Sequence, residues 1–183
     1  VEVNSSQGSV MIDAGKLDSQ SSIRLTSAAG TQVTGADLIA AGTGESEGLF
    51  INSNGGAVEV TSNTVSSGSV IDIESQKGAS LTVESLNAAG KLDVESKEGS
   101  INVSSEANGN TGGLQVAAES GSVTLRGLNV DSSTDIDVQA KDSISVTGGS
   151  LKNNDGSNLI LVSKEGNLNL ALNEKKLSAD TIT

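Results

Sequence analysis

The chain of 183 residues has a formal net charge of −12, contains no Pro, Cys, His, Trp or Tyr, and has Phe50 as its single aromatic residue. The acidic balance and the scattered Lys and Arg exclude a surface for nucleic acid or anionic membranes, both of which require clustered positive charge. Without histidine or cysteine the chain lacks the ligands of zinc sites and the base of a Ser-His-Asp triad, and no apolar run approaches the ~18 residues of a membrane span.

Alternating apolar and polar residues begin at the first position, and this period of two is typical of β-strands. An apolar pair recurs about every 22 residues, and we interpret each pair as the inward face of a first strand. These pairs are Val1/Val3, Ile23/Leu25, Leu49/Ile51, Ile71/Ile73, Leu92/Val94, Leu114/Val116, Ile136/Val138 and Leu159/Leu161. Because the pattern starts at Val1 without a Met, we expect the chain to be a fragment of a much longer protein.

A second inward pair follows each first pair, and then a single apolar residue marks a third strand. The second pairs are Val10/Ile12, Thr31/Val33, Val58/Val60, Leu81/Val83, Ile101/Val103, Val123/Leu125, Ile144/Val146 and Leu168/Leu170. The third-strand residues are Leu17, Leu38, Val65, Leu86, Val130, Leu151 and Leu177, with Asn108 as the odd member. Each repeat therefore predicts one coil with three short strands.

A unit of this size cannot bury its apolar face alone and must stack on copies of itself. The sequence predicts an all-β fold, a parallel β-helix of about eight coils with three short parallel sheets. Residues 1–183 would form one segment and a monomeric rod. Proline cannot donate to a ladder on both sides, and internal strands therefore explain its absence.

The corner after each first strand has a regular composition. A small residue comes first, and a glycine follows three positions later, which predicts a left-handed backbone at that glycine. The small residues are Ser5, Ser27, Ser53, Ser75, Ser96, Ala118, Ala140 and Ser163. The glycines are Gly8, Gly30, Gly56, Gly78, Gly99, Gly121 and Gly166, whereas the seventh coil has Asp142.

Two segments interrupt the period and should form surface loops, near 39–48 and 152–158. Insertions in repeat proteins often mark a binding face, but surface loops also tolerate extra residues at little thermodynamic expense. Glu45 and Glu47 are the candidate contact residues of the first loop.

Outward positions of two consecutive first strands place Asp72 and Glu74 beside Asp93 and Glu95, one coil apart. Like charges at ~4.8 Å repel by about 0.9 kcal/mol in water, unless a cation or one of the nearby lysines relieves them. Calcium prefers such oxygen ligands but normally needs a loop that wraps around the ion. A solvated acidic face is therefore the simpler interpretation, and we expect no metal or cofactor.

Paired carboxylates also perform glycoside chemistry, and β-helices host polysaccharide lyases and hydrolases. Such sites usually carry aromatic platforms and arginines, which we expect this face to lack, so we predict that the chain is not an enzyme. On the strand LILV, Ile160 and Val162 point outward and form either a contact patch or a covered site.

The strands GSINV, GSVTL and GNLNL and the Ser/Ala corner resemble the haemagglutinin-type repeats of filamentous haemagglutinin and related two-partner secretion exoproteins. The resemblance covers nearly the whole chain and lies in the repeat pattern. It implies a right-handed helix, export through an outer-membrane transporter, and display as a rod on a Gram-negative cell. The family's secretion domain carries Asn-Pro-Asn motifs, which this proline-free chain lacks.

The resulting hypothesis is a shaft segment of a secreted bacterial surface adhesin or toxin-delivery filament, which contributes to cell adhesion or cell–cell contact. Its partners would be the transporter and a receptor on a host or neighbouring cell. The alternative is a passenger domain of an autotransporter that binds a receptor or glycan directly, and a polysaccharide-active enzyme is third.

Overall fold

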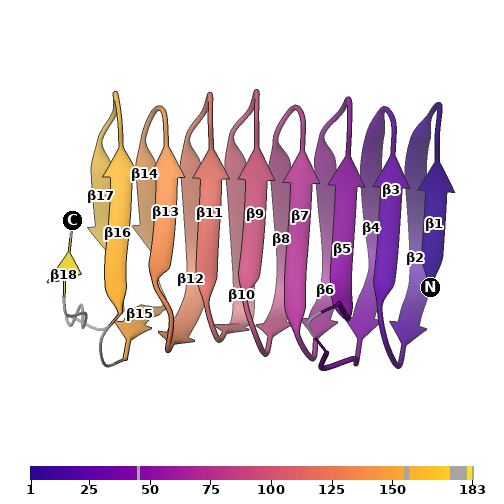
Figure 1. The fold of residues 1–183 in the computed structure, drawn as a ribbon, viewed down its shortest axis with the longest axis horizontal. Helices are drawn as coiled ribbons and strands as arrows, with labels where there is room; N and C mark the ends of the chain where they lie inside the picture. Colours follow the sequence, from indigo (N-terminus) through magenta and orange to yellow (C-terminus); the bar gives the residue numbers. More distant parts are fainter. Residues whose placement is uncertain (45, 155–156, 174–180, 183) are drawn as a thin grey trace.

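The computed structural model describes residues 1–44, 46–154, 157–173 and 181–182. The described chain is a parallel β-solenoid of about eight coils without helix, as predicted. Two nine-stranded sheets face each other along its length, in place of the three short sheets that the sequence predicts (Figure 1). None of the described residues forms a helix with the length and apolarity needed to cross a lipid bilayer.

The first sheet contains one short strand per coil, and we number the coils 1 to 8 by its strands from β1 to β16; β18 adds a ninth strand after coil 8. Its order is β1-β3-β5-β7-β9-β11-β13-β16-β18. The strands are β1 (Glu2–Ser5), β3 (Ile23–Ser27), β5 (Gly48–Ser53), β7 (Val70–Ser75), β9 (Leu92–Ser96), β11 (Leu114–Ala118), β13 (Ile136–Ala140), β16 (Asn158–Ser163) and β18 (Thr181–Ile182).

The second sheet contains the second and third predicted strands, which run together as one long strand in most coils. Its order is β17-β14-β12-β10-β8-β6-β4-β2, and β15 also pairs with β12. The strands are β2 (Ser9–Ser19), β4 (Gly30–Ala40), β6 (Val58–Ser67), β8 (Ala79–Ala88), β10 (Ile101–Thr111), β12 (Val123–Ser132), β14 (Ile144–Thr147), β15 (Ser150–Asn153) and β17 (Leu168–Ala171). Only coil 7 has separate second and third strands, β14 and β15, in the described part of the chain.

The core is a single apolar column between the sheets, and the predicted first-strand pairs of coils 2 to 8 are all buried. The second-strand pairs of coils 2 to 7 are buried as well. The end coils differ: Val1 and Leu168 are 48% and 47% exposed, because among the described residues the end strands β1 and β17 have a neighbour on one side only. Met11, at 74% exposed, points outward between Val10 and Ile12. The alternation of apolar residues in the sequence therefore predicts the core correctly wherever a coil is stacked on both sides.

The register of the third strand differs from the prediction in coils 5 to 7. Leu86 pairs with Gly109, which in turn pairs with Leu128, so neither Asn108 nor Val130 occupies this position. Asn108 is exposed. Val130 lies two residues after Leu128 and pairs with Thr111 on one side and Leu151 on the other. The shift occurs because β10 is irregular between Ser105 and Asn108, which moves the later residues relative to the apolar spacing. Leu177 lies outside the described residues.

The predicted left-handed glycines at the first corner are wrong except for Gly78, whose φ is 119°. The first corner needs glycine for a different reason: a Cβ on Gly99 would lie 2.3 Å from the carbonyl oxygen of Lys77 in the coil before it. Glycine is therefore required at this corner by the close approach of neighbouring coils.

Positive φ angles occur instead at the second corner, where the long strands bend. Gly35 and Gly127 have φ angles of 68° and 69°, a conformation that residues with a Cβ adopt at a cost. Gly15, Gly148 and Gly149 have positive φ at the same corner of their coils.

Serine at the first corner closes the turn through its hydroxyl. The backbone N–H of the glycine three residues later donates to this Oγ, at 3.0 Å for Gly78 and Ser75 and at 3.2 Å for Gly99 and Ser96. Ser75 Oγ also lies 2.6 Å from the carbonyl oxygen of Gly78. The small residue therefore both fits the narrow corner and satisfies backbone groups that would otherwise be buried without partners.

The two predicted loops are shorter than expected. Ile39 and Ala40 continue β4, so the first loop spans 41–47. Lys152, Asn153 and Asn158 belong to β15 and β16, so the second spans 154–157, of which 155–156 lie outside the described residues. In both cases the hydrogen-bonded ladder extends further into the polar segment than apolar spacing alone indicates.

Candidate functional site

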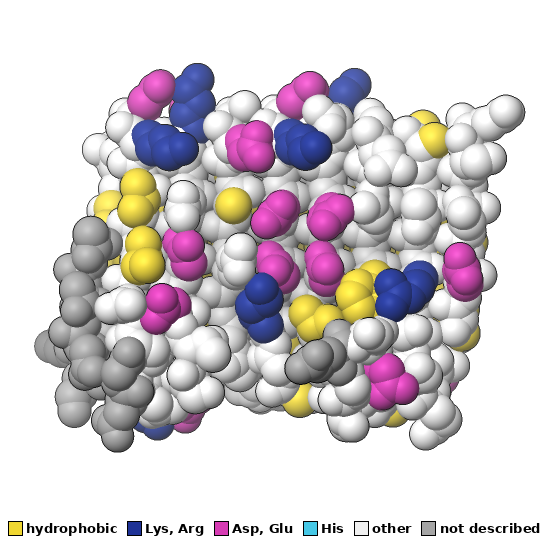
Figure 2. Space-filling model, viewed as in Figure 1, with side chains coloured by type: hydrophobic (Ala, Val, Ile, Leu, Met, Phe, Trp, Pro, Cys, Tyr) yellow, Lys and Arg dark blue, Asp and Glu magenta, His cyan; other side chains and the backbone are white. Residues whose placement is uncertain are grey.

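The predicted acidic ladder is present on the outward face of the first sheet. Asp72 pairs with Asp93, and Glu74 pairs with Glu95, across β7 and β9. These four carboxylates, which we call the acidic quartet, form a compact patch near the middle of this face (Figure 2). Adjacent strands in a sheet lie ~4.8 Å apart, so each carboxylate has a like charge directly beside it.

Lys91 is the lysine that partly neutralises the acidic quartet. Its Nζ lies 2.6 Å from Asp93 Oδ2 and donates to Gln115 Oε1 at 3.0 Å, so it links coils 5 and 6. On the other side of the acidic quartet, Asn52 Nδ2 donates to Glu74 Oε2 at 2.6 Å. The second oxygen of Asp93, Oδ1, is buried and has no hydrogen-bond partner. The side chain of Asp93 is 18% exposed.

Burial and mutual repulsion perturb two members of the acidic quartet. Burial, followed by the charges of Asp93, Glu74 and Glu95, raises the pKa of Asp72 to about 6. Burial, with Asp93 and Glu74 next in size, also raises the pKa of Glu95. In both cases Lys91 acts in the opposite direction, but its effect is the smaller one. Ionisation of all four carboxylates therefore lowers the free energy of unfolding of the chain.

The acidic quartet is a flat array rather than a cage. Side chains on one face of a sheet project roughly in parallel, whereas calcium is usually enclosed by six to eight oxygens. Within the part of the chain that the structure describes, no group of three or more acidic residues has the arrangement of a metal site.

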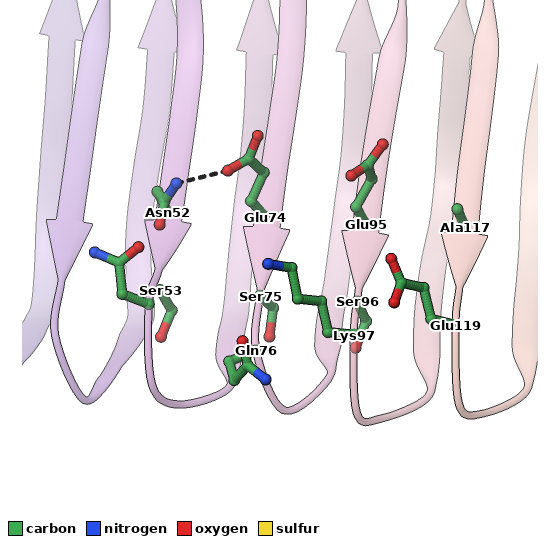
Figure 3. A pocket seen from close by; sticks show the side chains of 11 residues that line it. Asn52, Ser53, Glu74, Ser75, Gln76, Glu95, Ser96, Lys97, Ala117 and Glu119 are labelled. Carbon is green, nitrogen blue, oxygen red and sulfur yellow. Dashed lines mark hydrogen bonds between the residues drawn. The ribbon is translucent and has the colours of Figure 1, made fainter.

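A shallow hollow of about 320 Å³ runs along the first corner beside the acidic quartet. Glu74, Glu95 and Glu119 line it, and Lys97 extends from the corner toward β7 (Figure 3). A second hollow, of about 260 Å³, shares Asn52 and Glu74 with the first. The two hollows offer carboxylates, amides and one lysine on an open surface.

The second hollow contains a feature that we did not expect on this face, an arginine beside an aromatic ring. Arg24 pairs with Phe50 across β3 and β5, and the Arg24 guanidinium carbon lies 4.0 Å from the centroid of the Phe50 ring. Phe50 in turn pairs with Asp72. The expectation that this face has neither residue type is therefore wrong. The two inward pairs that flank Arg24 and Phe50 in the sequence already indicate that they share an outward row.

The loop 41–47 packs beside this pair. Arg24 Nη2 donates to the carbonyl oxygen of Ser46 at 2.8 Å, and Ser21 Oγ donates to Glu47 Oε1 at 3.0 Å. Hydrogen bonds from Gly44 N, the larger effect, and from Ser21 lower the pKa of Glu47. Glu47 therefore ties the loop to the rod, whereas Glu45 lies outside the described residues.

The outward apolar residues Ile160 and Val162 on β16 are only half-buried. They pair with Asp137 and Gln139 on β13, and β18 pairs with the beginning of β16. They therefore continue the mixed outward surface of the first sheet at its last full coil.

No family model, curated protein or solved structure matches this chain. The interpretation of the site thus depends on the geometry of its residues.

Proposed function

We propose that the chain is a structural shaft segment of a large secreted bacterial surface adhesin or toxin-delivery filament. The observation that supports the proposal is the uninterrupted stack of near-identical coils, in which the described strands pair in parallel from β1 to β18. Such a stack holds its two ends apart at a fixed distance, about 38 Å for eight coils at ~4.8 Å each. This role requires length and stiffness and needs no catalytic group.

Export and partners are part of the same proposal. The resemblance of the corner and strand motifs to two-partner secretion exoproteins supports export through an outer-membrane transporter and display on the cell surface. The sequence is rich in Ser, Thr, Asn and acidic residues, and acidic side chains are spread over the face in Figure 2, which suits a rod surrounded by water. A receptor on a host or neighbouring cell would be contacted by another part of such a filament.

A second candidate function is direct binding of a receptor or glycan, as in a passenger domain of an autotransporter. One specific observation favours it: Phe50, the single aromatic residue, and Arg24 line one hollow of this face, and the longer insertion contacts Arg24 through the carbonyl oxygen of Ser46. A sugar ring commonly binds where an aromatic or guanidinium plane lies beside amide and carboxylate groups.

Replacement of the loop 41–47 by Gly-Ser distinguishes the two functions. The dipeptide Gly68-Ser69 joins β6 to β7 at the equivalent register, since Ala40 pairs with Ser67 and Gly48 with Val70. The variant should therefore keep its circular dichroism spectrum and its rod shape. The chain and the variant would be displayed on Gram-negative cells, and binding to host cells and to neighbouring bacteria would be counted.

If the chain is a shaft segment, cells that display the wild-type chain and cells that display the Gly-Ser variant should bind other cells equally weakly. Binding by the wild-type chain that the Gly-Ser variant loses, with its fold intact, would contradict the shaft and support direct recognition. Arg24→Ala, which removes the guanidinium and leaves the loop sequence unchanged, is the matched second variant.

A further inference from the structure

The pairing of β7 with β9 places Asp72 and Asp93 directly opposite each other on the outward face. Their backbones are held at the ~4.8 Å spacing of neighbouring strands, and the flat sheet gives the two carboxylates little freedom to diverge. Each of the other residues on this outward row has an uncharged or differently charged neighbour. Gln115, for example, separates Asp93 from Asp137.

The hydrogen bonds around Asp93 leave one acceptor without a donor. Lys91 occupies Oδ2, and Oδ1 is buried with no partner. A buried carboxylate oxygen without a donor is unfavourable, and native structures rarely leave one. The missing donor has to come from a group that faces Asp93 on the same surface.

The groups that face Asp72 supply no such donor at neutral pH. Its own strand contributes Glu74, and β9 contributes Asp93 and Glu95, with Lys91 immediately before that strand. On the other side, β5 presents the uncharged Phe50 and Asn52, and the side-chain amide of Asn52 donates to Glu74. Arg24 of β3 lines the same hollow as Asp72, but its guanidinium lies over the Phe50 ring and donates to the carbonyl oxygen of Ser46. Lys97 of the following corner lies in the first hollow, beside Glu74 and Glu95. Beyond β9 the neighbours are the uncharged Gln115 and Ala117 of β11, and then Glu119.

We propose that Asp72 and Asp93 form an acid–carboxylate pair that holds one proton in mild acid, and that this proton strengthens the junction between coils 4 and 5. The protonated Asp72 carboxyl donates its O–H to Asp93 Oδ1, and Asp93 keeps its contact with Lys91 through Oδ2. One proton thereby supplies the missing donor and removes the like-charge repulsion between Asp72 and Asp93. The rod becomes more stable in mild acid than at neutral pH.

The direction of the pH effect follows from linkage. The pKa of Asp72 is about 6 in the folded chain and 3.8 in the unfolded reference, so the folded state binds the proton more tightly. The stabilisation is fully present below the unfolded value and is lost as the pH rises through the folded one. The pH window of the effect therefore runs from about 4 to about 6.

Thermal unfolding of the intact chain between pH 4.5 and pH 7.5 tests the proposal, with Asp72→Asn compared with Asp137→Asn. Asp137 lies on the same outward row and has no carboxylate as a direct cross-strand partner, so its substitution removes the same charge outside the pair. In Asp72→Asn, the new side-chain amide donates to Asp93 Oδ1 at every pH. The wild type and Asp137→Asn should unfold at a Tm about 3 °C higher at pH 4.5, and Asp72→Asn should lose this difference by becoming more stable at pH 7.5.

Equal pH dependence in the two variants would overturn the proposal, since general charge repulsion would then explain the effect. A carboxyl-carbon NMR titration of the wild type gives an independent result if Asp72→Asn does not fold. An Asp72 resonance that titrates below pH 4.5 also contradicts the pair. If 5 mM calcium chloride at pH 7.5 raises the Tm of the wild type as much as acid does, and Asp72→Asn abolishes this, the missing partner is a cation and the proton pair is wrong.

Discussion

Leu128 in coil 6 lies over the α-carbon of Gly109 in coil 5, so that a Cβ built on Gly109 would approach Leu128 Cδ2 to 3.0 Å. The same Cβ would lie 2.6 Å from the carbonyl oxygen of Gly127. In coils 1 to 4 and in coil 6 this position carries an apolar side chain: Leu17, Leu38, Val65, Leu86 and Leu128. Leu128 of coil 6 thus occupies the space that a side chain at position 109 of coil 5 would need.

Gly109→Ala should destabilise the chain by about 1–3 kcal/mol, because the added methyl overpacks a buried contact that includes backbone. Gly113→Ala is the matched control, since its Cβ would meet only ordinary contacts at 3.5–3.6 Å, from Lys91 and Thr134. Urea unfolding measures both. A Gly109→Ala variant as stable as the control would contradict the register that we describe for β10.

Ile101→Asp should lower the free energy of unfolding by more than about 4 kcal/mol, because it places a carboxylate in the apolar column. Ile101 is 1% exposed, whereas its neighbour Asn102 points outward. Asn102→Asp adds the same charge and should change stability by less than about 0.5 kcal/mol. Circular dichroism during heating distinguishes the two, and similar curves would disprove the inward assignment of Ile101.

Ser75→Ala should cost about 1–2 kcal/mol, although it removes a single oxygen atom. The hydroxyl accepts from Gly78 N and Lys77 N at 3.0 and 3.2 Å, and Ser75 is only 5% exposed. Ala118 and Ala140 occupy the same corner in other coils, so the change introduces no steric conflict. Ser80→Ala, on the outward face of β8, is the control and should behave like the wild type in urea.

Lys91→Met should lower the Tm more at pH 7.5 than at pH 4.5. Lys91 opposes the rise in the pKa of Asp72 and of Glu95, so its removal makes the ionised acidic quartet still less favourable in the folded state. Lys77→Met, an exposed lysine of the preceding corner, removes the same charge away from Asp93. If both variants respond equally to pH, the contact between Lys91 and Asp93 does not matter for stability.

The solenoid and its core were predictable because the apolar pairs repeat at nearly constant spacing. Residues such as Leu92 and Val94 alternate cleanly, and equal coil lengths bring Asp72 beside Asp93 without further information. The third strand was less predictable, since an irregularity in β10 shifts its register and no residue type marks that shift. Apolar spacing therefore predicts which residues face inward better than it predicts which coil positions are equivalent.

Features that depend on contacts between coils were the ones missed. A glycine pattern indicates a turn, but Gly99 is required by the carbonyl of Lys77 in another coil, which no local pattern shows. The outward row shared by Arg24 and Phe50 follows from their flanking inward pairs, but the approach of the guanidinium to the ring depends on side-chain conformations that the sequence does not show. The unpartnered oxygen of Asp93 depends on side-chain conformations, for which the sequence offers no signal.

Each strand of the solenoid pairs with one about 22 residues away, as Glu2 pairs with Arg24 and Asn158 with Thr181. The chain therefore closes a loop of nearly the same short length for every coil, and the entropy of closure does not grow as coils are added. Folding can then proceed coil by coil from any coil that has formed, because each finished coil provides the strand edges with which the next coil pairs. A rod of any length would fold by repetition of this one step.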